Sequence, residues 1–412
     1  MRVGVLVTTT YTHDSRVRRA AEFLAELGHE VHVVCCFSSQ LPAHDGEKIG
    51  PVRVHRVARE TRDFLSIALS RLGRRRYGSS PTPSHNGPPR SALSPRVLSR
   101  IRSLLVPLII LHRRKQQRRM ARVLAGLCPD VVHANDPDTL PAAKAAIQGG
   151  ATLVYDAHEL SWSRNDTSRW ERRLDLRAER RFVPRAAAVI TVSPGIADIL
   201  QERYGVTALV IRSVPHTPED WSPPFDLRDE IGADTEDRII LYQGLRSPGR
   251  GLPQLIRAVG LMSQCHLVLL GSEVRGMDQQ LQAVAAELQN EDRVHILDPV
   301  PSEKLLTMTA QADVGTCLIE DVSLSFKLSL PNKLFEYLAA GVPVVASDLP
   351  EIRRVIEDCR GGVVCDPSQP KAIASALQRT VQPPDRERVP TAREELQKLE
   401  ACYGLLSDQD DA

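Results

Sequence analysis

The sequence has no C-x-x-C pair and no regular spacing among its eight cysteines. Disulfide frameworks and zinc sites depend on such spacings, so we expect buried free thiols in a reducing compartment. The net charge is only +2, which gives the protein as a whole no pull toward nucleic acid or membrane. The most apolar segment, 104–111, is far shorter than the roughly 20 residues of a membrane helix. The N-terminus begins with a strand pattern at Val3–Val7 instead of a signal peptide, so we predict a cytoplasmic protein.

Two common nucleotide-binding signatures are also missing. No G-x-G-x-x-G follows an apolar run, which disfavours an NAD-dependent dehydrogenase. The segment 244–251 nearly imitates a P-loop, but it lacks the lysine and the Ser/Thr that hold magnesium, which excludes a P-loop NTPase. The composition, 42% apolar and 25% charged, is that of an ordinary soluble protein, and 412 residues suffice for two domains.

Short apolar runs alternate with helical stretches in both halves of the chain, and 215–224 between the halves is rich in proline. The predicted strands of the first half are Val3–Val7, Glu30–Cys35, Val52–Val57, Asp130–His133, Thr152–Tyr155, Ala188–Val192 and Ala208–Ile211. Those of the second half are Ile239–Tyr242, His266–Leu270, Val294–Ile296, Asp313–Thr316, Pro343–Ala346 and Gly362–Val364. Such alternation predicts parallel sheets covered by helices. We predict an α/β protein with two Rossmann-like domains that face each other across a cleft. The predicted parts are a first domain 1–214, a linker 215–224, a second domain 225–388, and a C-terminal helix and tail 389–412, of which the helix crosses back onto the first domain.

One segment of the first half departs from this pattern. Residues 74–95 are dense in Arg, Pro, Ser and Gly, which predicts a mobile loop. The next segment, 96–122, is apolar and then basic. It fits a patch that docks on an anionic membrane or a lipid acceptor, which would make the protein peripheral to the inner membrane face. It also fits a helix pair with a solvated basic face, and we favour this second interpretation because Pro107 interrupts the apolar stripe.

The most informative stretch is 329–343. Pro331 and Asn332 lead into an amphipathic helix, so free backbone N–H groups point out of its first turn. Lys333 adds a full positive charge there, and Glu336 follows one turn later. A helix N-terminus beside a lysine suits a diphosphate, and a neighbouring carboxylate can accept hydrogen bonds from sugar hydroxyls.

This stretch resembles the nucleotide-sugar motif of the retaining family 4 glycosyltransferases, which have the GT-B fold. The resemblance implies that Glu336 holds the ribose of the donor and that the amides of Asn332–Leu334 bind its phosphates. Family members carry a first glutamate eight positions earlier, where this chain has Leu328. The resemblance leaves open what replaces that glutamate; the nearby polar side chains are those of Ser325 and Glu320.

A second phosphate-facing element is predicted at 239–251, where a strand, a glycine-rich turn and a helix start follow one another. Family 4 enzymes place Gly-Arg and Lys-Gly here, and the matching residues are Gly244-Leu245 and Arg250-Gly251. The resemblance therefore implies that Gly244 and Arg250 contact the donor. Arg246, one residue after the leucine, is predicted to supply the missing arginine.

Three strand ends of the first half carry polar side chains. His158 and Glu159 resemble the family segment in which a histidine lies near the reacting sugar. Asp14 and Arg16 resemble a family loop near the acceptor, although Asp14 also fits a helix cap. Asp136-x-Asp138 matches the D-x-D pattern of metal-dependent enzymes, but family 4 enzymes need no metal here. We predict Asp136 as an N-cap or acceptor-side residue and no obligatory metal or cofactor.

Together these features predict a transferase that moves a sugar from a nucleoside diphosphate sugar to a hydroxyl or another nucleophile, with retention of configuration. The acceptor can be a polysaccharide, a lipid-linked glycan or a small metabolite. His158, Arg250 and Lys333 are the predicted catalytic residues, and no nucleic acid partner is expected. Two alternatives remain: a nucleotide-sugar 2-epimerase of the same fold, and a non-catalytic protein of this fold that binds a membrane or partner.

Overall fold

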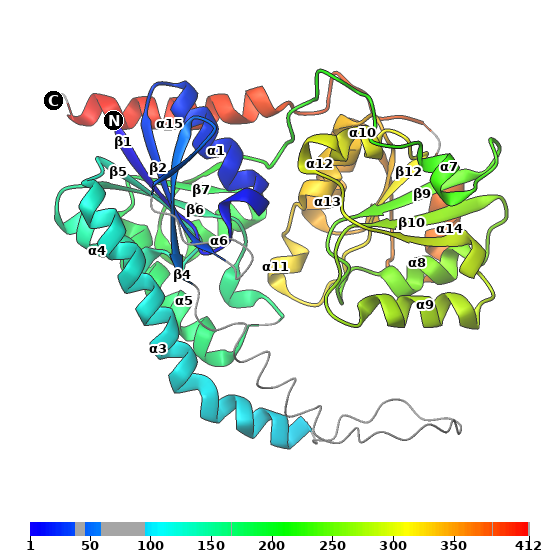
Figure 1. The fold of residues 1–412 in the computed structure, drawn as a ribbon, viewed down its shortest axis with the longest axis horizontal. Helices are drawn as coiled ribbons and strands as arrows, with labels where there is room; N and C mark the ends of the chain where they lie inside the picture. The colour runs from blue at the N-terminus through cyan, green and yellow to red at the C-terminus, as the bar shows by residue number, and fades with distance from the viewer. Residues whose placement is uncertain (38–45, 59–94, 166, 381, 411–412) are drawn as a thin grey trace. The chain divides into compact units, whose positions relative to one another are not determined.

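The structure is a computed structural model that describes residues 1–37, 46–58, 95–165, 167–380 and 382–410. Figure 1 shows the chain from its N-terminus in blue to its C-terminus in red. The chain folds into two compact units, each packed mainly against itself. The first unit comprises Met1–Asp156 and Ser168–Ala188, and the second comprises Ala157–Thr167 and Val189–Ala412. The predicted mobile loop 74–95 lies outside the described residues, apart from Pro95.

The first sheet has eight strands in the order β3-β4-β2-β1-β5-β6-β7-β8. The strand pairs β1–β2, β1–β5, β2–β4, β5–β6 and β7–β8 are parallel, whereas β3 pairs antiparallel with β4. Its strands are β1 (Arg2–Leu6), β2 (Glu30–Phe37), β3 (Glu47–Ile49), β4 (Val52–Ala58), β5 (Val131–Asn135), β6 (Thr152–Ala157), β7 (Ala188–Thr191) and β8 (Ala208–Val210). The predicted apolar runs correspond to these strands, except that β3 was not predicted.

The helices α1, α5 and α6 of the first half begin at residues whose side chains cap them. The carboxylate of Asp14 accepts a hydrogen bond from the Val17 amide at the start of α1, and Ser168 with Glu171 forms a capping box on α5. The helices are α1 (Ser15–Glu26), α3 (Pro95–Leu127), α4 (Leu140–Gln148), α5 (Arg169–Phe182) and α6 (Pro194–Tyr204), with short 3-10 turns η1 (Tyr11–His13), η2 (Ser161–Ser163) and η3 (Val183–Arg185).

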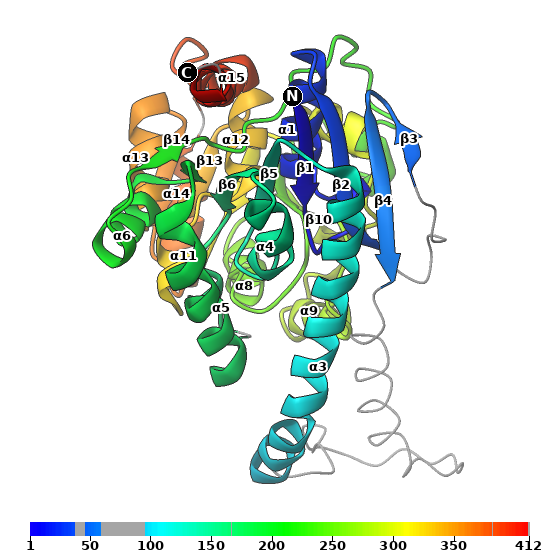
Figure 2. The same cartoon turned by 90° about the vertical axis from the view of Figure 1, so that its left-hand side faces the viewer.

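α3 corrects the prediction of a helix pair around Pro107. It is a single helix of 33 residues that continues through the proline. Proline removes one backbone hydrogen bond, which a long helix tolerates when its other turns are intact. α3 packs beside α4, and α4 packs beside α5, so the three helices lie side by side (Figure 2).

The second sheet has six strands in the order β11-β10-β9-β12-β13-β14, and its strands pair in parallel. They are β9 (Arg238–Gln243), β10 (Cys265–Leu270), β11 (Val294–Leu297), β12 (Val314–Cys317), β13 (Val344–Ser347) and β14 (Gly362–Cys365). Every predicted strand of the second half is present. Because both faces are covered, the strands are nearly continuous apolar runs, which is why they stood out in the sequence.

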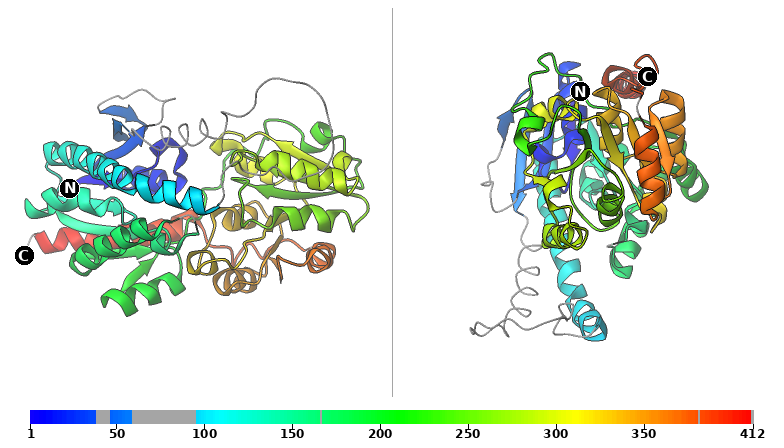
Figure 3. Two further views of the ribbon diagram at one scale, coloured as in Figure 1. Left: turned by 90° about the horizontal axis from the view of Figure 1, so that it is seen from below. Right: turned by 90° about the vertical axis from the view of Figure 1, so that its right-hand side faces the viewer.

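Helices cover both faces of this sheet (Figure 3). Leu334 and Phe335 pack with Leu241 in one core cluster, and Leu255 and Ile256 pack with other strand residues in a second cluster. The helices are α7 (Leu227–Ile231), α8 (Leu252–Val259), α9 (Met277–Glu287), α10 (Leu305–Thr309), α11 (Leu324–Lys327), α12 (Asn332–Ala339), α13 (Pro350–Cys359), α14 (Pro370–Arg379) and α15 (Ala392–Asp410), with 3-10 turns η4 (Glu291–Arg293) and η5 (Ser302–Lys304).

The last helix, α15, returns to the end of the first sheet. The carboxylate of Glu395 accepts a hydrogen bond from the Arg212 amide at 2.8 Å, and the Lys398 ammonium donates to the Val210 carbonyl at 3.5 Å. Val210 ends β8, the last strand of the eight-stranded sheet. α15 is therefore the crossover helix that the sequence predicted.

Two pairs of histidines join neighbouring strands at matching places in the two sheets. His32 on β2 and His55 on β4 have ring nitrogens 2.9 Å apart, and His266 on β10 and His295 on β11 repeat this distance. Their rings stack with centroids 5.2 and 5.1 Å apart. Burial lowers the pKa of His295, and the charge of its neighbour His266 adds to the shift.

The eight cysteines are free, as predicted, and all but the exposed Cys128 are buried.

Candidate functional site

Lys333 lies in the first turn of α12, at the carboxyl edge of the second sheet. Its ammonium sits 3.5 Å from the centroid of the Tyr242 ring, a cation–π contact with a residue that is itself buried. Gly244 lies beside this lysine, and a β-carbon at the glycine would be in ordinary contact with the ammonium nitrogen, at 3.6 Å, so the backbone angle and not the space favours glycine here. The φ angle of Gly244 is 107°, which side-chain-bearing residues rarely adopt.

Burial lowers the pKa of Lys333 to about 7. The positive charge of Arg250 adds to this shift, whereas Cys317 and Glu336 oppose it. A lysine in this state loses its charge readily, and an anion placed beside it would restore the charge. The Cys317 thiol beside it stays protonated, because burial raises its pKa to about 11.

Arg250 approaches the same place from the turn after β9. Its guanidinium carbon lies 5.0 Å from the centroid of the Phe326 ring, and its charge acts on Lys333, Tyr242 and Cys317. Gly249 allows the close approach of Phe326, because a β-carbon at this glycine would lie 2.9 Å from the ring. Two cations from separate loops therefore converge at the end of β9.

Glu336 is held by a chain of polar groups behind it. The Gln243 side-chain amide donates to the Glu336 carboxylate at 2.5 Å, and the Thr309 hydroxyl donates to the Gln243 side-chain oxygen at 2.7 Å. The Tyr337 hydroxyl accepts a hydrogen bond from the Gln243 backbone amide. Gln243 and Thr309 are buried, so this chain fixes the direction in which the carboxylate points.

The first turn of α12 corrects one predicted donor contact. Leu334 donates its amide to the Pro331 carbonyl at 3.0 Å, and its side chain is fully buried in the core. It therefore has neither an amide nor a side chain to offer a ligand. Pro331 has extended backbone angles and precedes the helix, so the turn starts with the amides of Asn332 and Lys333.

The position of Arg246 corrects a second predicted contact with the donor. Its guanidinium is paired with the Asp278 carboxylate at 2.5 Å, and it donates to the carbonyls of Leu269, Gly271 and Leu297. Only 3% of its side chain is exposed. Arg246 therefore ties the turn after β9 to β10 and α9 and is not available to a phosphate. Leu245, at the position of the family arginine, is half-exposed and does not replace it.

Glu159 and His158 directly follow β6. The Glu159 carboxylate accepts a hydrogen bond from the Ser325 hydroxyl at 3.2 Å and pairs with Arg164 at 3.0 Å. Leu328 cannot stand in for the missing glutamate, since its carbonyl accepts from the Ser193 hydroxyl and its side chain lies beside Gly195. The acids that touch the 324–328 segment include Asp321, which pairs with Lys327 at 3.7 Å, and Glu159, which comes from a distant part of the sequence.

In the first unit, two of the predicted acceptor-side residues, Asp14 and Arg16, are bonded to other parts of the protein. The Asp14 carboxylate caps α1 and also accepts from the Thr9 hydroxyl, so its predicted alternative as a cap is confirmed. Arg16 forms a bidentate pair with Asp156, in which its Nη2 donates to Oδ1 at 2.9 Å and its Nε donates to Oδ2 at 3.1 Å. Thr139, not Asp136, is the N-cap of α4, which corrects the cap prediction for Asp136. These contacts account for Asp14 without a ligand, whereas the acceptor-side role of Arg16 and Asp136 stays a prediction.

Sequence reasoning missed four side chains of the site: Tyr242, Gln243, Thr309 and Phe326. Tyr242 and Gln243 end an apolar strand and looked like its continuation. A polar Gln243 directly before Gly244 is the one signal that was available in the sequence.

Family models of two glycosyltransferase domains match this chain. A glycosyl transferase 4-like domain matches residues 13–217, and a glycosyl transferases group 1 domain matches residues 237–382. The chain belongs to the family 4-like glycosyltransferases. This membership confirms the family that the motifs of the second half predicted.

Curated relatives are similar to this chain over part of their length. It is 27% identical over 243 residues to the D-inositol 3-phosphate glycosyltransferase of Paenarthrobacter aurescens (strain TC1), covering 56% of the chain and 58% of the relative. It is 25% identical over 263 residues to the alpha-D-kanosaminyltransferase of Streptomyces kanamyceticus, covering 58% and 64%. The chain thus spans about three fifths of the length of these relatives.

Solved structures resemble the chain over nearly all of its length. Sucrose-phosphate synthase from Thermosynechococcus elongatus has a TM-score of 0.73 at 16% identity, with 99% of this chain and 100% of that one covered. Anabaena HepE in complex with UDP-glucose has a TM-score of 0.65 at 16% identity, with 99% and 100% covered. These likenesses confirm the predicted GT-B fold of this chain.

Proposed function

We propose that the protein transfers a sugar from a nucleoside diphosphate sugar to an acceptor nucleophile. The observation that carries the proposal is the convergence of the Lys333 ammonium and the Arg250 guanidinium at the end of β9. Two cations beside a helix start suit a diphosphate, which becomes more negative as it leaves the sugar. Stabilising this developing charge is the catalytic task that we assign to them.

The nucleoside end of the donor is assigned to Glu336. A carboxylate held by Gln243 accepts hydrogen bonds from two neighbouring hydroxyls, as a ribose presents them. The amides of the first turn of α12, at Asn332 and Lys333, bind the phosphates, and Gly244 allows the donor to approach the backbone. Pro331 sets the start of this turn.

The sugar end of the donor is assigned to His158 and to the pair of Glu159 and Ser325. This pair supplies the carboxylate and hydroxyl that a sugar needs, in place of the glutamate absent at Leu328. Retention follows when the acceptor attacks on the face that the diphosphate leaves and a phosphate oxygen takes its proton. No protein nucleophile is used in that step. Determining the anomeric configuration of the first product by NMR tests this part of the proposal.

The acceptor is proposed to be a small hydroxylated molecule or a glycan. The relatives named above carry an inositol phosphate and an aminosugar in their names. A panel of nucleotide sugars, screened by thermal shift, identifies the donor, because a ligand that binds the folded state raises Tm. UDP-sugars come first, since structures similar to this one contain UDP or UDP-glucose.

The screen has a clear negative outcome. If no nucleotide sugar raises Tm at millimolar concentration, the proposed donor site is wrong. If a nucleotide sugar binds and is converted to its 2-epimer without transfer, the epimerase alternative holds instead.

Donor binding is expected to take up a proton at alkaline pH. In the free protein Lys333 has a pKa of about 7, so at pH 8 it is mostly neutral. The diphosphate raises this pKa, so the lysine is charged in the complex. Donor affinity should therefore fall up to about tenfold for each pH unit above 7. Calorimetry at pH 8 in buffers of different ionisation enthalpy measures the uptake, expected near one proton for the protein and near zero for Lys333→Met. Equal uptake by both proteins would contradict the assignment.

A further inference from the structure

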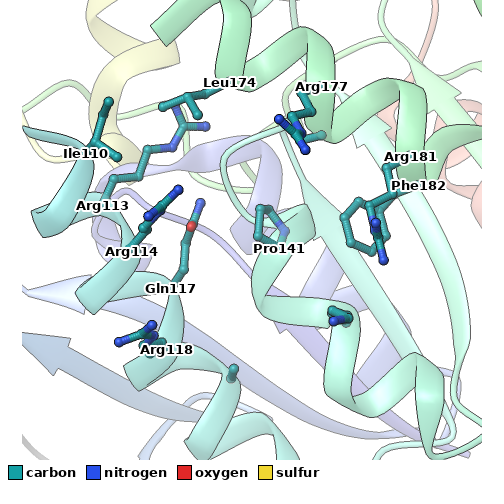
Figure 4. A pocket seen from close by; sticks show the side chains of 13 residues that line it. Ile110, Arg113, Arg114, Gln117, Arg118, Pro141, Leu174, Arg177, Arg181 and Phe182 are labelled. Carbon is teal, nitrogen blue, oxygen red and sulfur yellow. The ribbon is translucent and has the colours of Figure 1, made fainter. Parts of the chain in front are cut away.

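The first unit carries a groove of about 510 Å³ between α3, α4 and α5, and none of the residues that line it is assigned above to the donor (Figure 4). Among the described residues, none of the side chains that line it is acidic. The cations that line it come from all three helices and are Arg113, Arg114, Arg118, Lys144, Arg177 and Arg181.

Most of this positive charge is not neutralised by the protein. Arg113 pairs with Asp175 at 2.5 Å. Arg114, Arg118, Lys144 and Arg177 are exposed, and they form no ion pair within the part of the chain that the structure describes. Like charges gathered without counter-charges repel one another, and an external anion would relieve this repulsion.

Apolar side chains lie among these cations. Ile110, Leu174, Pro141 and Phe182 line the same groove. In sequence, the most apolar segment of the chain, 104–111, leads directly into it. A surface that combines apolar side chains with arginines suits the headgroup region of a membrane, where the cations meet lipid phosphates and the apolar groups meet the acyl boundary. Among the described residues no helix combines the length and apolarity needed to cross a bilayer.

Two other kinds of anionic partner fit the groove less well. Proteins that bind single-stranded nucleic acid stack bases on exposed aromatic rings, but the aromatic residue here, Phe182, is buried. A small soluble phosphate is bound by cations and amides that converge on one point. Here the exposed cations are spread along three helices, as a surface with many phosphates requires.

We propose that this groove is a docking site for the headgroups of an anionic phospholipid membrane. The proposal does not depend on the transfer reaction. The proposal replaces the interpretation favoured from the sequence, in which 96–122 is a helix pair with a solvated basic face. Pro107 does not break α3, and α4 and α5 add cations that lie outside 96–122. Docking here would hold the first unit against the membrane.

Binding to vesicles tests the proposal with the full-length protein. We expect it to sediment with vesicles of about 30% phosphatidylglycerol in phosphatidylcholine but not with phosphatidylcholine alone, and to be released at about 0.5 M salt. The triple variant Arg114→Gln, Arg118→Gln, Arg177→Gln should bind about 100-fold more weakly, by the usual contribution of each cation near an anionic surface. The charge-preserving variant with lysine at the same positions should still bind.

The matched control removes three equally exposed cations of the same helices that do not line the groove: Lys115→Gln, Arg122→Gln, Arg180→Gln. We expect binding weakened by less than about fivefold. If both triple variants lose vesicle binding equally, the membrane attracts the basic surface in general, and the proposal that the groove is the docking site is wrong. Groove-dependent binding of pyrophosphate or of single-stranded RNA, with no binding to anionic vesicles, would replace the membrane by a soluble anion or a nucleic acid.

Discussion

Replacing Lys333 by methionine is expected to lower the rate of sugar transfer by about 10²–10³-fold. The ammonium is one of two charges placed where the diphosphate departs, and a thioether cannot stabilise that departure. Methionine fits the space over the Tyr242 ring, and removing a buried charge should leave stability unchanged or raise it. The measurement is initial rate with the donor found in the nucleotide-sugar screen, together with Tm.

Lys371→Met is the matched control, because this exposed lysine of α14 lies outside the site. Its rate should stay within about twofold of that of the unchanged protein. If Lys333→Met transfers sugar at the normal rate while the donor still binds, the catalytic role of the lysine is wrong. If only the KM rises, Lys333 contributes equally to binding the donor in the ground state and in the transition state.

The second prediction with a large effect concerns Arg246 and Arg250, whose replacement should affect different properties of the protein. Arg246→Ala should destabilise the protein by about 3–5 kcal/mol, because it leaves the Asp278 carboxylate without its buried partner and several carbonyls without a donor. Arg250→Ala should change stability by less than about 1 kcal/mol but lower transfer at least about 100-fold. Urea unfolding and initial rates on the same preparations measure both effects.

The opposite pattern would reverse the assignment. A stable Arg246→Ala protein that no longer binds the donor would return Arg246 to the phosphate site. An Arg250→Ala protein with normal transfer would show that its stacking on Phe326 serves only the packing of the turn.

The strands and the donor motif could be predicted because each has a local sequence signal. Parallel strands buried on both faces are short apolar runs, and the motif at 329–343 combines a helix start with a charged side chain. Every apolar run singled out in the second half became a strand. These signals depend on neighbours in the sequence and need no knowledge of distant contacts.

The remaining contacts of the site could not be predicted, because they depend on the direction in which each side chain points in the folded protein. Arg246 and Arg250 lie in one turn, and nothing local distinguishes them. Backbone pairing of Arg246 with Glu273, in an isolated β-bridge, directs the Arg246 side chain toward Asp278. Asp278 lies on α9, 32 positions further along the chain. Likewise, the pairing of Glu159 with Ser325 joins residues 166 positions apart. Such contacts follow from the folded topology, so a pattern in the sequence cannot reveal them.

The matching histidine pairs of the two sheets have a consequence for acid conditions. A link between two imidazole nitrogens 2.9 Å apart needs one nitrogen with a hydrogen and one without. In the second sheet, burial lowers the pKa of His295, so this ring keeps its neutral form as the solution becomes more acidic. The hydrogen bond that joins β10 to β11 should therefore persist in mild acid and be lost only when His295 itself takes up a proton.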